Sequence, residues 1–230
     1  MADRYLLHYG ATKNNIYFNH FTSLHEKDIL QKLPSLDDKN FVRQAKGITE
    51  KKVILSVGQF VHRKGYDVLL KAAAKLTQDI GVYIIGGQIT LEYEQLVKEL
   101  NLRNVHFIDF MSPDKLKYYY LAADVFVLPT REDVWGLVIN EAMACGLPIV
   151  TTDHCVAGIE MITNGVNGYV VPIENPEMLR SAIEQILSDE NLRNNMASAN
   201  LRMIIDYTYE VSSKDVISAI VNVYQFSYKK

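Results

Sequence analysis

The stretch Thr130-Arg-Glu-Asp-Val-Trp-Gly-Leu-Val-Ile-Asn-Glu-Ala-Met-Ala-Cys-Gly-Leu-Pro-Ile-Val150 decides the fold of this chain. An apolar run, 124–129, precedes it and predicts a buried parallel strand. A helix is expected to begin near Gly136, and Gly146 with Pro148 close behind is typical of a helix C-terminus. A strand, a loop and a helix N-terminus in this order direct backbone N–H groups and a positive helix end at one point, which suits a phosphate group.

Two acidic side chains flank this expected phosphate site. Asp133 and Glu141 are separated by seven residues, and their carboxylates can accept hydrogen bonds from hydroxyl groups. Phosphate-binding N–H donors next to hydroxyl-binding acceptors are what a nucleotide-sugar site requires. The alternative is an ordinary surface helix that carries acids in its first turns because they suit the helix dipole.

The same run resembles the E-x7-E block of the family 4 retaining glycosyltransferases, which have the two-domain GT-B architecture. Asp133 stands where the family usually has its first Glu, and Glu132 lies one residue out of register as a further donor contact. In the family the second acid binds the ribose hydroxyls and the first faces the donor sugar. The resemblance therefore implies that Glu141 binds ribose and that Asp133 is the catalytic residue. It also implies phosphate contacts from the amides at the helix start, namely Gly136, Leu137 and Val138.

An earlier apolar run ends at Gly58 and predicts another buried strand, followed by a polar loop. This loop resembles the family's Gly-Arg-x4-Lys-Gly segment, whose Arg and Lys clamp the diphosphate. Gly58 and Lys64 match the segment, but Gln59 replaces the Arg, and an amide supplies no charge. Arg63 or His62 from the same loop is the candidate to compensate. The alternative for both is a solvated loop face.

The next predicted strand ends in a glycine pair, and a further short strand carries His106. These segments resemble the parts of the family that hold the nucleotide base, largely through backbone atoms. The resemblance implies donor contacts from Gly86 and Phe110. His106 alternates with apolar neighbours, so we expect a core or edge histidine whose hydrogen bonds are satisfied, not a ligand contact.

The 230 residues are 48% hydrophobic and 22% charged, with a formal net charge of −3, an ordinary balance for a globular protein. No basic patch supports nucleic-acid binding, and no run of about eighteen apolar residues supports a transmembrane segment. The two cysteines, Cys145 and Cys155, have no metal-ligand spacing, and no strand leads into Asp-x-Asp. We therefore expect no metal and no other cofactor. A reducing, cytoplasmic location is expected, with membrane association an open alternative for the full-length protein.

Short apolar strands alternate with amphipathic helices, which predicts an α/β fold: a doubly wound, mostly parallel Rossmann-like sheet with helices on both faces. The resemblance makes this one half of a GT-B fold, because a complete enzyme has two such halves. Residues 45–230 are expected to form the nucleotide-sugar (donor) binding domain. Residues 1–44 are expected to be a remnant of the acceptor domain and its hinge, with Tyr5–Tyr9 as the last strand of the missing half.

The resemblance implies transfer of a sugar from a nucleotide-sugar donor to a hydroxyl of a sugar or lipid-linked acceptor. Retention at the anomeric carbon and a role in polysaccharide or glycoconjugate biosynthesis are further implications. The acceptor would be bound by the missing N-terminal domain, so we expect this fragment alone to be inactive. The alternative is a non-catalytic nucleotide-sugar-binding module that needs a partner chain.

Three other α/β classes lack their sequence signals in this chain. An NAD-dependent enzyme needs G-x-G-x-x-G after the first strand, and the residues that follow Gly58 do not supply it. A response regulator needs an acidic cluster at the same place, and an α/β-hydrolase needs G-x-S-x-G. Neither pattern is present in the sequence.

Overall fold

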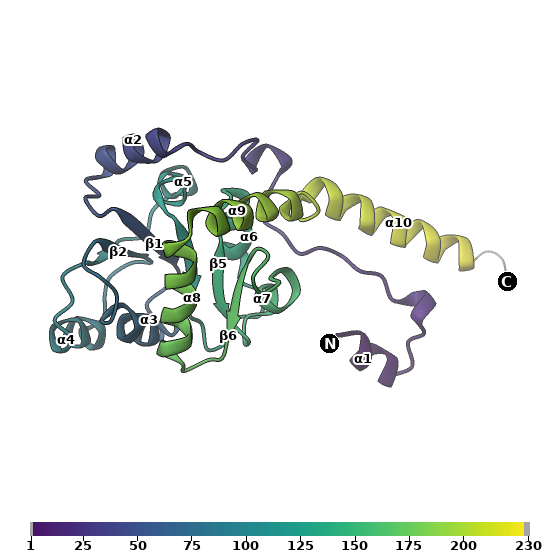
Figure 1. Cartoon of the computed structure of the whole chain (residues 1–230). Helices are drawn as coiled ribbons and strands as arrows, with labels where there is room; N and C mark the ends of the chain where they lie inside the picture. Colours follow the sequence, from purple (N-terminus) through teal and green to yellow (C-terminus); the bar gives the residue numbers. More distant parts are fainter. Residues whose placement is uncertain (1, 228–230) are drawn as a thin grey trace.

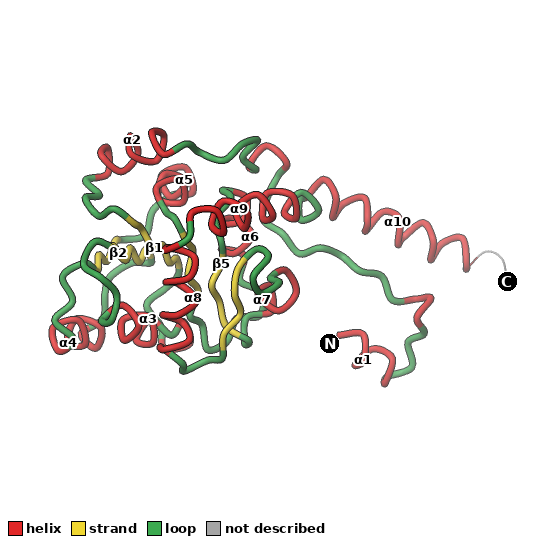
Figure 2. Tube along the Cα trace, viewed as in Figure 1, coloured by secondary structure: helices red, strands yellow, loops and turns green. Residues whose placement is uncertain are grey.

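The computed structural model describes residues 2–227 and contains a six-stranded sheet in which every neighbouring pair of strands is parallel. The strand order is β3-β2-β1-β4-β5-β6. The strands are β1 (Lys52–Val57), β2 (Ile80–Ile85), β3 (Val105–Ile108), β4 (Val125–Leu128), β5 (Ile149–Thr152) and β6 (Gly168–Val171). They lie in the middle of the body with helices around them (Figures 1 and 2).

Helices lie on both faces of the sheet (Figure 1). On one face lie α2 (Leu36–Lys46), α5 (Pro113–Ala122), α6 (Leu137–Ala144) and α7 (Val156–Met161). On the other face lie α3 (Tyr66–Ala73), α4 (Leu91–Glu99) and α8 (Pro176–Ser188). The long helix α9 (Glu190–Ile204) packs against both α6 and α8 and so joins the two layers.

Alternate residues of the central strands point to opposite faces, which gives the body two hydrophobic clusters. In β1, Val53 and Leu55 belong to the cluster beneath α5 and α6, whereas Ile54 belongs to the cluster beneath α3 and α8. Crossover helices cover both faces of a parallel sheet, so its strands read as continuous apolar runs. The doubly wound, Rossmann-like sheet predicted from the sequence is confirmed.

The strand order reverses between β1 and β4. The chain proceeds from β1 to β2 and β3 on one side, then returns to β4 and continues to β5 and β6 on the other. Ligands of open α/β sheets bind at such a reversal, outside the carboxyl ends of the strands. The two loops there approach each other closely. A Cβ on Gly65, whose φ is 66°, would lie 2.1 Å from the carbonyl oxygen of Pro129.

His106 lies on the edge strand β3, as predicted, and one of its ring nitrogens has a hydrogen-bond partner. Its Nε2 is 2.6 Å from Oε1 of Glu50, and its ring stacks on Tyr83 with centroids 4.4 Å apart. The hydroxyl of Tyr83 donates to the other oxygen of Glu50 at 2.7 Å. This cluster ties the chain before β1 to β2 and β3.

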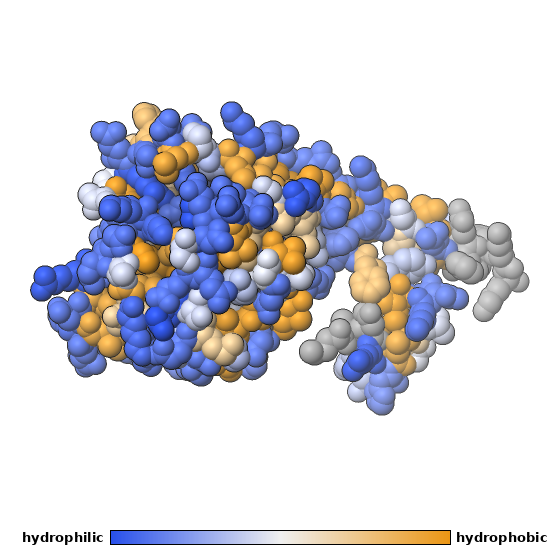
Figure 3. Space-filling view, in the orientation of Figure 1, coloured by the Kyte–Doolittle hydropathy of each residue, from blue (hydrophilic) through white to orange (hydrophobic). Residues whose placement is uncertain are grey.

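The predicted strand at Tyr5–Tyr9 is wrong, because the structure has a helix there, α1 (Ala2–His8). In Figure 1 α1 lies apart from the sheet, and none of the strand pairings within residues 2–227 involves this segment. A helix satisfies its backbone hydrogen bonds internally and needs no such partner. Leu6 is 43% exposed, and the segment carries apolar patches in Figure 3. The assignment of residues 1–44 to an acceptor-domain remnant stays a prediction.

The chain after α1 reaches the body from His20 onward, because the ring of His20 lies against Tyr207 with centroids 4.7 Å apart. Thr22 donates its hydroxyl to the carbonyl of Tyr207 at 2.6 Å, and Leu24 and Ile29 are core residues. The carbonyl of Leu24 accepts from the N–H of Tyr209, the first residue of α10 (Tyr209–Ser227). Helix α10 then projects away from the sheet (Figure 1). Within residues 2–227, no helix combines the length and apolar character that crossing a membrane requires.

Candidate functional site

Two of the predicted site residues form a close ion pair where the strand order reverses. Lys64 ends the short helix η3 (His62–Lys64) in the loop after β1, and Asp133 lies in the loop after β4. Nζ of Lys64 is 2.5 Å from Oδ2 of Asp133, and only 10% and 13% of the two side chains are exposed. The structure thus places a shielded cation and a shielded acid together at the carboxyl edge of the sheet.

The loop that carries Asp133 is fixed by backbone hydrogen bonds to the loop after β5. The N–H of Asp133 donates to the carbonyl of His154 at 3.1 Å, and the carbonyl of Asp133 accepts from the N–H of Val156 at 3.2 Å. His154 is itself an exposed loop residue. Main-chain contacts on both sides therefore set the position from which the Asp133 side chain reaches Lys64.

Sequence reasoning missed Arg131, which joins the loops after β1 and β4. Its guanidinium donates to the carbonyl of His62 at 2.7 Å and pairs with Asp67 at 2.8 Å. Its backbone N–H donates to the carbonyl of Arg63, also at 2.7 Å. Arg131 is adjacent in sequence to Glu132 and Asp133, but the sequence of a loop does not show which distant residues a single arginine will contact.

The N-terminus of α6 opens shortly after Asp133. Gly136 has a left-handed φ of 98°, and a Cβ there would lie 2.9 Å from Sγ of Cys155, so glycine is required. Within the described chain no side chain caps this helix end. The first N–H groups of a helix have no acceptor inside it, so those of Leu137 and Val138 are available to an anion.

Glu141 lies further along α6, beside a cavity of about 360 Å³ between α5, α6 and the N-terminal segment. The hydroxyl of Tyr120 donates to Oε2 of Glu141 at 2.9 Å. Burial raises the pKa of the Glu141 carboxyl, and the hydrogen bond from Tyr120 acts in the opposite direction. Tyr120 is a second residue whose part in the site was missed, because helical periodicity identifies it as a core residue and says nothing of its hydroxyl.

Residues 38–203 match the family described as "Glycosyl transferases group 1". The chain belongs to this family. It is 31% identical over 194 residues to the uncharacterized glycosyltransferase MJ1607 of Methanocaldococcus jannaschii, a match over 82% of this chain and 48% of that protein. It is 35% identical over 189 residues to the D-inositol 3-phosphate glycosyltransferase of Corynebacterium urealyticum, over 76% and 44% respectively. The chain therefore spans about half the length of the curated relatives it matches.

A solved C-terminal domain of a glycosyl transferase group 1 family protein, LpcC from Francisella tularensis, has a similar fold. The TM-score is 0.69 at 26% sequence identity, and the match covers 77% of this chain and 96% of that domain. Nearly the whole of that domain thus has a counterpart in this chain. The predicted fold class, a doubly wound sheet that corresponds to one half of the GT-B fold, is confirmed.

The other residues predicted to contact the donor lie around the ion pair, some of them buried and others exposed. Gly58 and Gly86 pack directly together, because a Cβ on Gly86 would lie 1.7 Å from the carbonyl oxygen of Gly58. Gln59 and Arg63 are exposed. Nη1 of Arg63 lies 3.4 Å from the carbonyl oxygen of Glu132, whose own side chain points into solvent. Of the two neighbouring acids, the structure brings Asp133 to Lys64.

Phe110 stands apart from these residues. It is 82% exposed in the connection between β3 and α5, so its contact with a base stays a prediction. Within residues 2–227, no three His, Cys, Asp or Glu side chains are grouped so that they could hold a metal ion. Cys145 and Cys155 are both buried free thiols.

Proposed function

We propose that this chain binds a nucleotide-sugar donor, and that the whole protein transfers the hexose-type sugar to a hydroxyl acceptor with retention. The observation that carries the proposal is the shielded Lys64–Asp133 pair close to the uncapped N-terminus of α6. A diphosphate needs a cation and N–H donors, and a sugar needs acceptors for its hydroxyl groups. These groups lie at one edge of the sheet, at the reversal of strand order.

Lys64 supplies the fixed positive charge for the diphosphate. An ammonium group that gives one hydrogen bond to Asp133 retains two further N–H donors. The amides of Gly136, Leu137 and Val138 add donors from the helix end. Arg63 is exposed and can swing toward the phosphates, where its guanidinium would replace the charge that Gln59 lacks.

Glu141 binds the ribose hydroxyls, and Asp133 faces the donor sugar. When the bond between the anomeric carbon and the phosphate oxygen breaks, negative charge develops on the leaving diphosphate. Lys64 and the α6 amides stabilise that charge, because they are already oriented before the reaction. A metal ion is unnecessary in this scheme, so transfer by the full-length protein should persist in EDTA.

We also propose that this chain alone binds donor without transferring it. Transfer requires reacting atoms held about 3–3.5 Å apart, so the acceptor must be bound across the same cleft. The curated relatives are about twice as long as the matched region, which leaves room for an acceptor-binding half. The acceptor is a sugar or a lipid-linked sugar of polysaccharide or glycoconjugate biosynthesis in the cytoplasm, with membrane association as the alternative.

Titration calorimetry with UDP, GDP and ADP tests the donor site. We expect one of them to bind, and both Lys64→Met and Glu141→Gln to weaken it about tenfold to a hundredfold, since each change removes hydrogen bonds to a charged group. Lys75→Met is the matched control, because Lys75 is an exposed lysine paired with Glu177 of α8. Affinity in both site variants equal to that of the Lys75 variant would overturn the proposal.

A further inference from the structure

Tyr120 and Glu141 form a buried contact between α5 and α6. Tyr120 is 3% exposed, and its ring lies against Phe126 of β4 with centroids 5.9 Å apart, so its hydroxyl has a fixed position. That hydroxyl donates to Oε2 of Glu141 at 2.9 Å. Within residues 2–227, the second carboxylate oxygen, Oε1, has no hydrogen-bond partner. One oxygen of Glu141 is thus held by the protein and the other is available.

The cavity beside Glu141 has the character of a site for a polar ligand. Both Tyr120 and Glu141 line it, together with Ser23 and Leu24 of the N-terminal segment. Oγ of Ser23 is buried and, within the described chain, has no hydrogen-bond partner. Buried polar atoms without partners are rare in folded proteins unless a ligand or water satisfies them. Two residues that line the cavity, Glu141 and Ser23, therefore each carry an oxygen that has no hydrogen-bond partner within the described chain, and that of Ser23 is buried.

The place of Glu141 on α6 suits the ribose of a nucleotide whose phosphates bind at the helix N-terminus. Glu141 follows Gly136 along the helix, which puts it roughly 7 Å further along the axis at 1.5 Å per residue. A nucleotide with its diphosphate on the α6 amides would then extend along the helix toward the cavity. Its ribose would reach the free oxygen of Glu141.

We infer that Tyr120 is a positioning residue for donor binding: its hydroxyl holds Glu141 so that Oε1 accepts a ribose hydroxyl in the cavity. The inference rests on the proposed function, in which Glu141 binds ribose. A carboxylate free to rotate would present either oxygen and would have to be ordered when the donor binds. The hydrogen bond from Tyr120 already orders the carboxylate before the donor binds. Binding therefore does not have to include the entropic cost of ordering Glu141.

The same hydrogen bond also favours the ionised form of Glu141, which is the form that accepts from hydroxyl groups. Besides Tyr120, the titratable groups that face the cavity are Asp28 of the short helix η2 (Glu26–Asp28), Asp114 and Lys117 of α5, and Cys145. Burial raises the pKa of Glu141, and loss of the Tyr120 hydroxyl would raise it further. As the solution is acidified, a variant without the Tyr120 hydroxyl should therefore lose its affinity for a ribonucleotide at a higher pH than the unmodified protein does.

The test compares a ribonucleotide with its 2′,3′-dideoxy form, using whichever of UDP, GDP or ADP binds the unmodified protein. We expect Tyr120→Phe to weaken the ribonucleotide about tenfold and to leave the dideoxynucleotide unchanged, because only the ribose hydroxyls contact Glu141. The pH at which the preference for ribose disappears should also rise. Tyr119→Phe is the matched control, since Tyr119 is a partly buried neighbour on the same helix.

An equal loss for both nucleotides in Tyr120→Phe would overturn the inference, because it would show a structural role only. Absence of any ribose preference in the unmodified protein, together with an unchanged affinity in Glu141→Gln, would instead overturn the ribose role of Glu141 in the proposed function. If the phenylalanine variant does not fold, 3-fluorotyrosine at position 120 keeps the hydrogen bond and makes it stronger. The pH below which the protein no longer prefers the ribonucleotide to the dideoxynucleotide should then fall. If that pH does not change, the inference is overturned.

Discussion

Nζ of Lys64 lies 2.5 Å from Oδ2 of Asp133, so an ion pair links the loops after β1 and β4. Both side chains are largely shielded, which strengthens their mutual attraction compared with a pair in open water. A diphosphate that approaches Lys64 must therefore share it with Asp133, and the two anions repel each other. The acid assigned to the donor sugar is thus expected to oppose binding of the bare nucleotide.

Asp133→Asn should tighten the binding of the nucleoside diphosphate about threefold to tenfold, because it removes the competing anion and its repulsion. Calorimetric titration at low ionic strength measures the change. Glu132→Gln is the control, since the Glu132 side chain is the exposed acid next in sequence and should change affinity little. A larger effect in Glu132→Gln than in Asp133→Asn would show that the wrong acid has been assigned.

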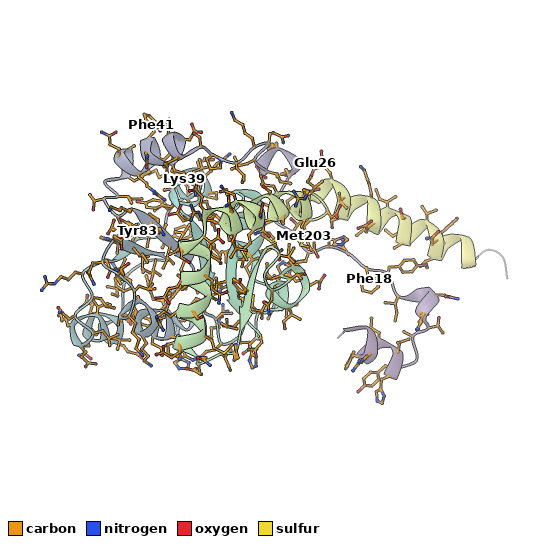
Figure 4. The ribbon with its side chains drawn as sticks, viewed as in Figure 1. Phe18, Glu26, Lys39, Phe41, Tyr83 and Met203 are labelled. Carbon is orange, nitrogen blue, oxygen red and sulfur yellow. The ribbon has the colours of Figure 1, made fainter. Side chains whose placement is uncertain are left out.

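Asp124 is the anionic centre of a buried cluster on the far side of the body from the site loops. It pairs with Arg43 at 2.7 Å and with Lys39 at 3.1 Å, and both reach it from α2. Lys39 lies on the side of α2 that faces the body, whereas Phe41 points to solvent (Figure 4). The carboxylate also accepts from the N–H of Val53 at 2.9 Å. The cluster therefore fastens α2 to the start of β1.

Asp124→Asn should lower the free energy of unfolding by about 3 kcal/mol, because it leaves two shielded cations without their partner. Urea unfolding followed by circular dichroism measures the loss. Glu177→Gln, which breaks the exposed pair with Lys75, should cost less than about 0.5 kcal/mol. Equal losses in the two variants would contradict a stabilising role for the buried cluster.

The same cluster predicts a pH dependence of stability. Burial opposes ionisation of Asp124, but the charges of Lys39 and Arg43 outweigh it and hold the pKa below its ordinary value. A carboxyl group whose pKa is depressed in the folded state stabilises above its unfolded pKa and loses that effect as the pH falls through the folded pKa. The stability difference between the unmodified protein and Asp124→Asn should therefore be constant near neutral pH and shrink below roughly pH 4. A difference that grows on acidification would contradict this.

The fold could be predicted because β1, β2 and β4 are mostly apolar, buried runs, and because Gly58 and Gly86 follow β1 and β2 where the two loops approach each other closely. The strand pattern and the family resemblance together predict that Lys64 and Asp133 lie at the carboxyl ends of neighbouring strands, and the structure places them there. The contact between them could not be predicted, since it depends on how two loops pack. For the same reason Arg131 was missed, and helical periodicity indicates a core position for Tyr120 without predicting the contact that its hydroxyl makes. At α1 an apolar run was interpreted as a strand, although strand pairing needs a neighbour that sequence periodicity cannot show.

Both thiols should be inert in the folded protein. Burial raises the pKa of Cys145 to about 12, and burial also raises the pKa of Cys155. The reactive thiolate of Cys145 is then roughly a thousandfold scarcer than in an exposed cysteine at the same pH. Release of thionitrobenzoate from Ellman's reagent should be slow in buffer and reach two equivalents rapidly in urea. Rapid reaction of one thiol without urea would show that the end of α6 or the loop after β5 opens.

Gly86→Ala should damage both the stability and the donor site, whereas Gly87→Ala should be mild. A Cβ on Gly86 would lie 1.7 Å from the carbonyl oxygen of Gly58, a backbone atom that can move only if the loop after β1 moves. We expect a loss of about 2–3 kcal/mol in unfolding free energy, similar to other overpacked sites. Nucleotide affinity should fall as well, because the displaced loop carries Lys64.

Gly87 provides an adjacent control for that change. A Cβ there would meet nothing within 4 Å, although its φ of 112° disfavours any other residue. Gly87→Ala should therefore cost only about 1 kcal/mol of backbone strain and leave Lys64 in place. Thermal unfolding and calorimetric titration of the two variants side by side separate the effects. Equal nucleotide affinities in the two variants would show that the contact between Gly58 and Gly86 does not position the loop, and that Lys64 is held by its pair with Asp133 alone.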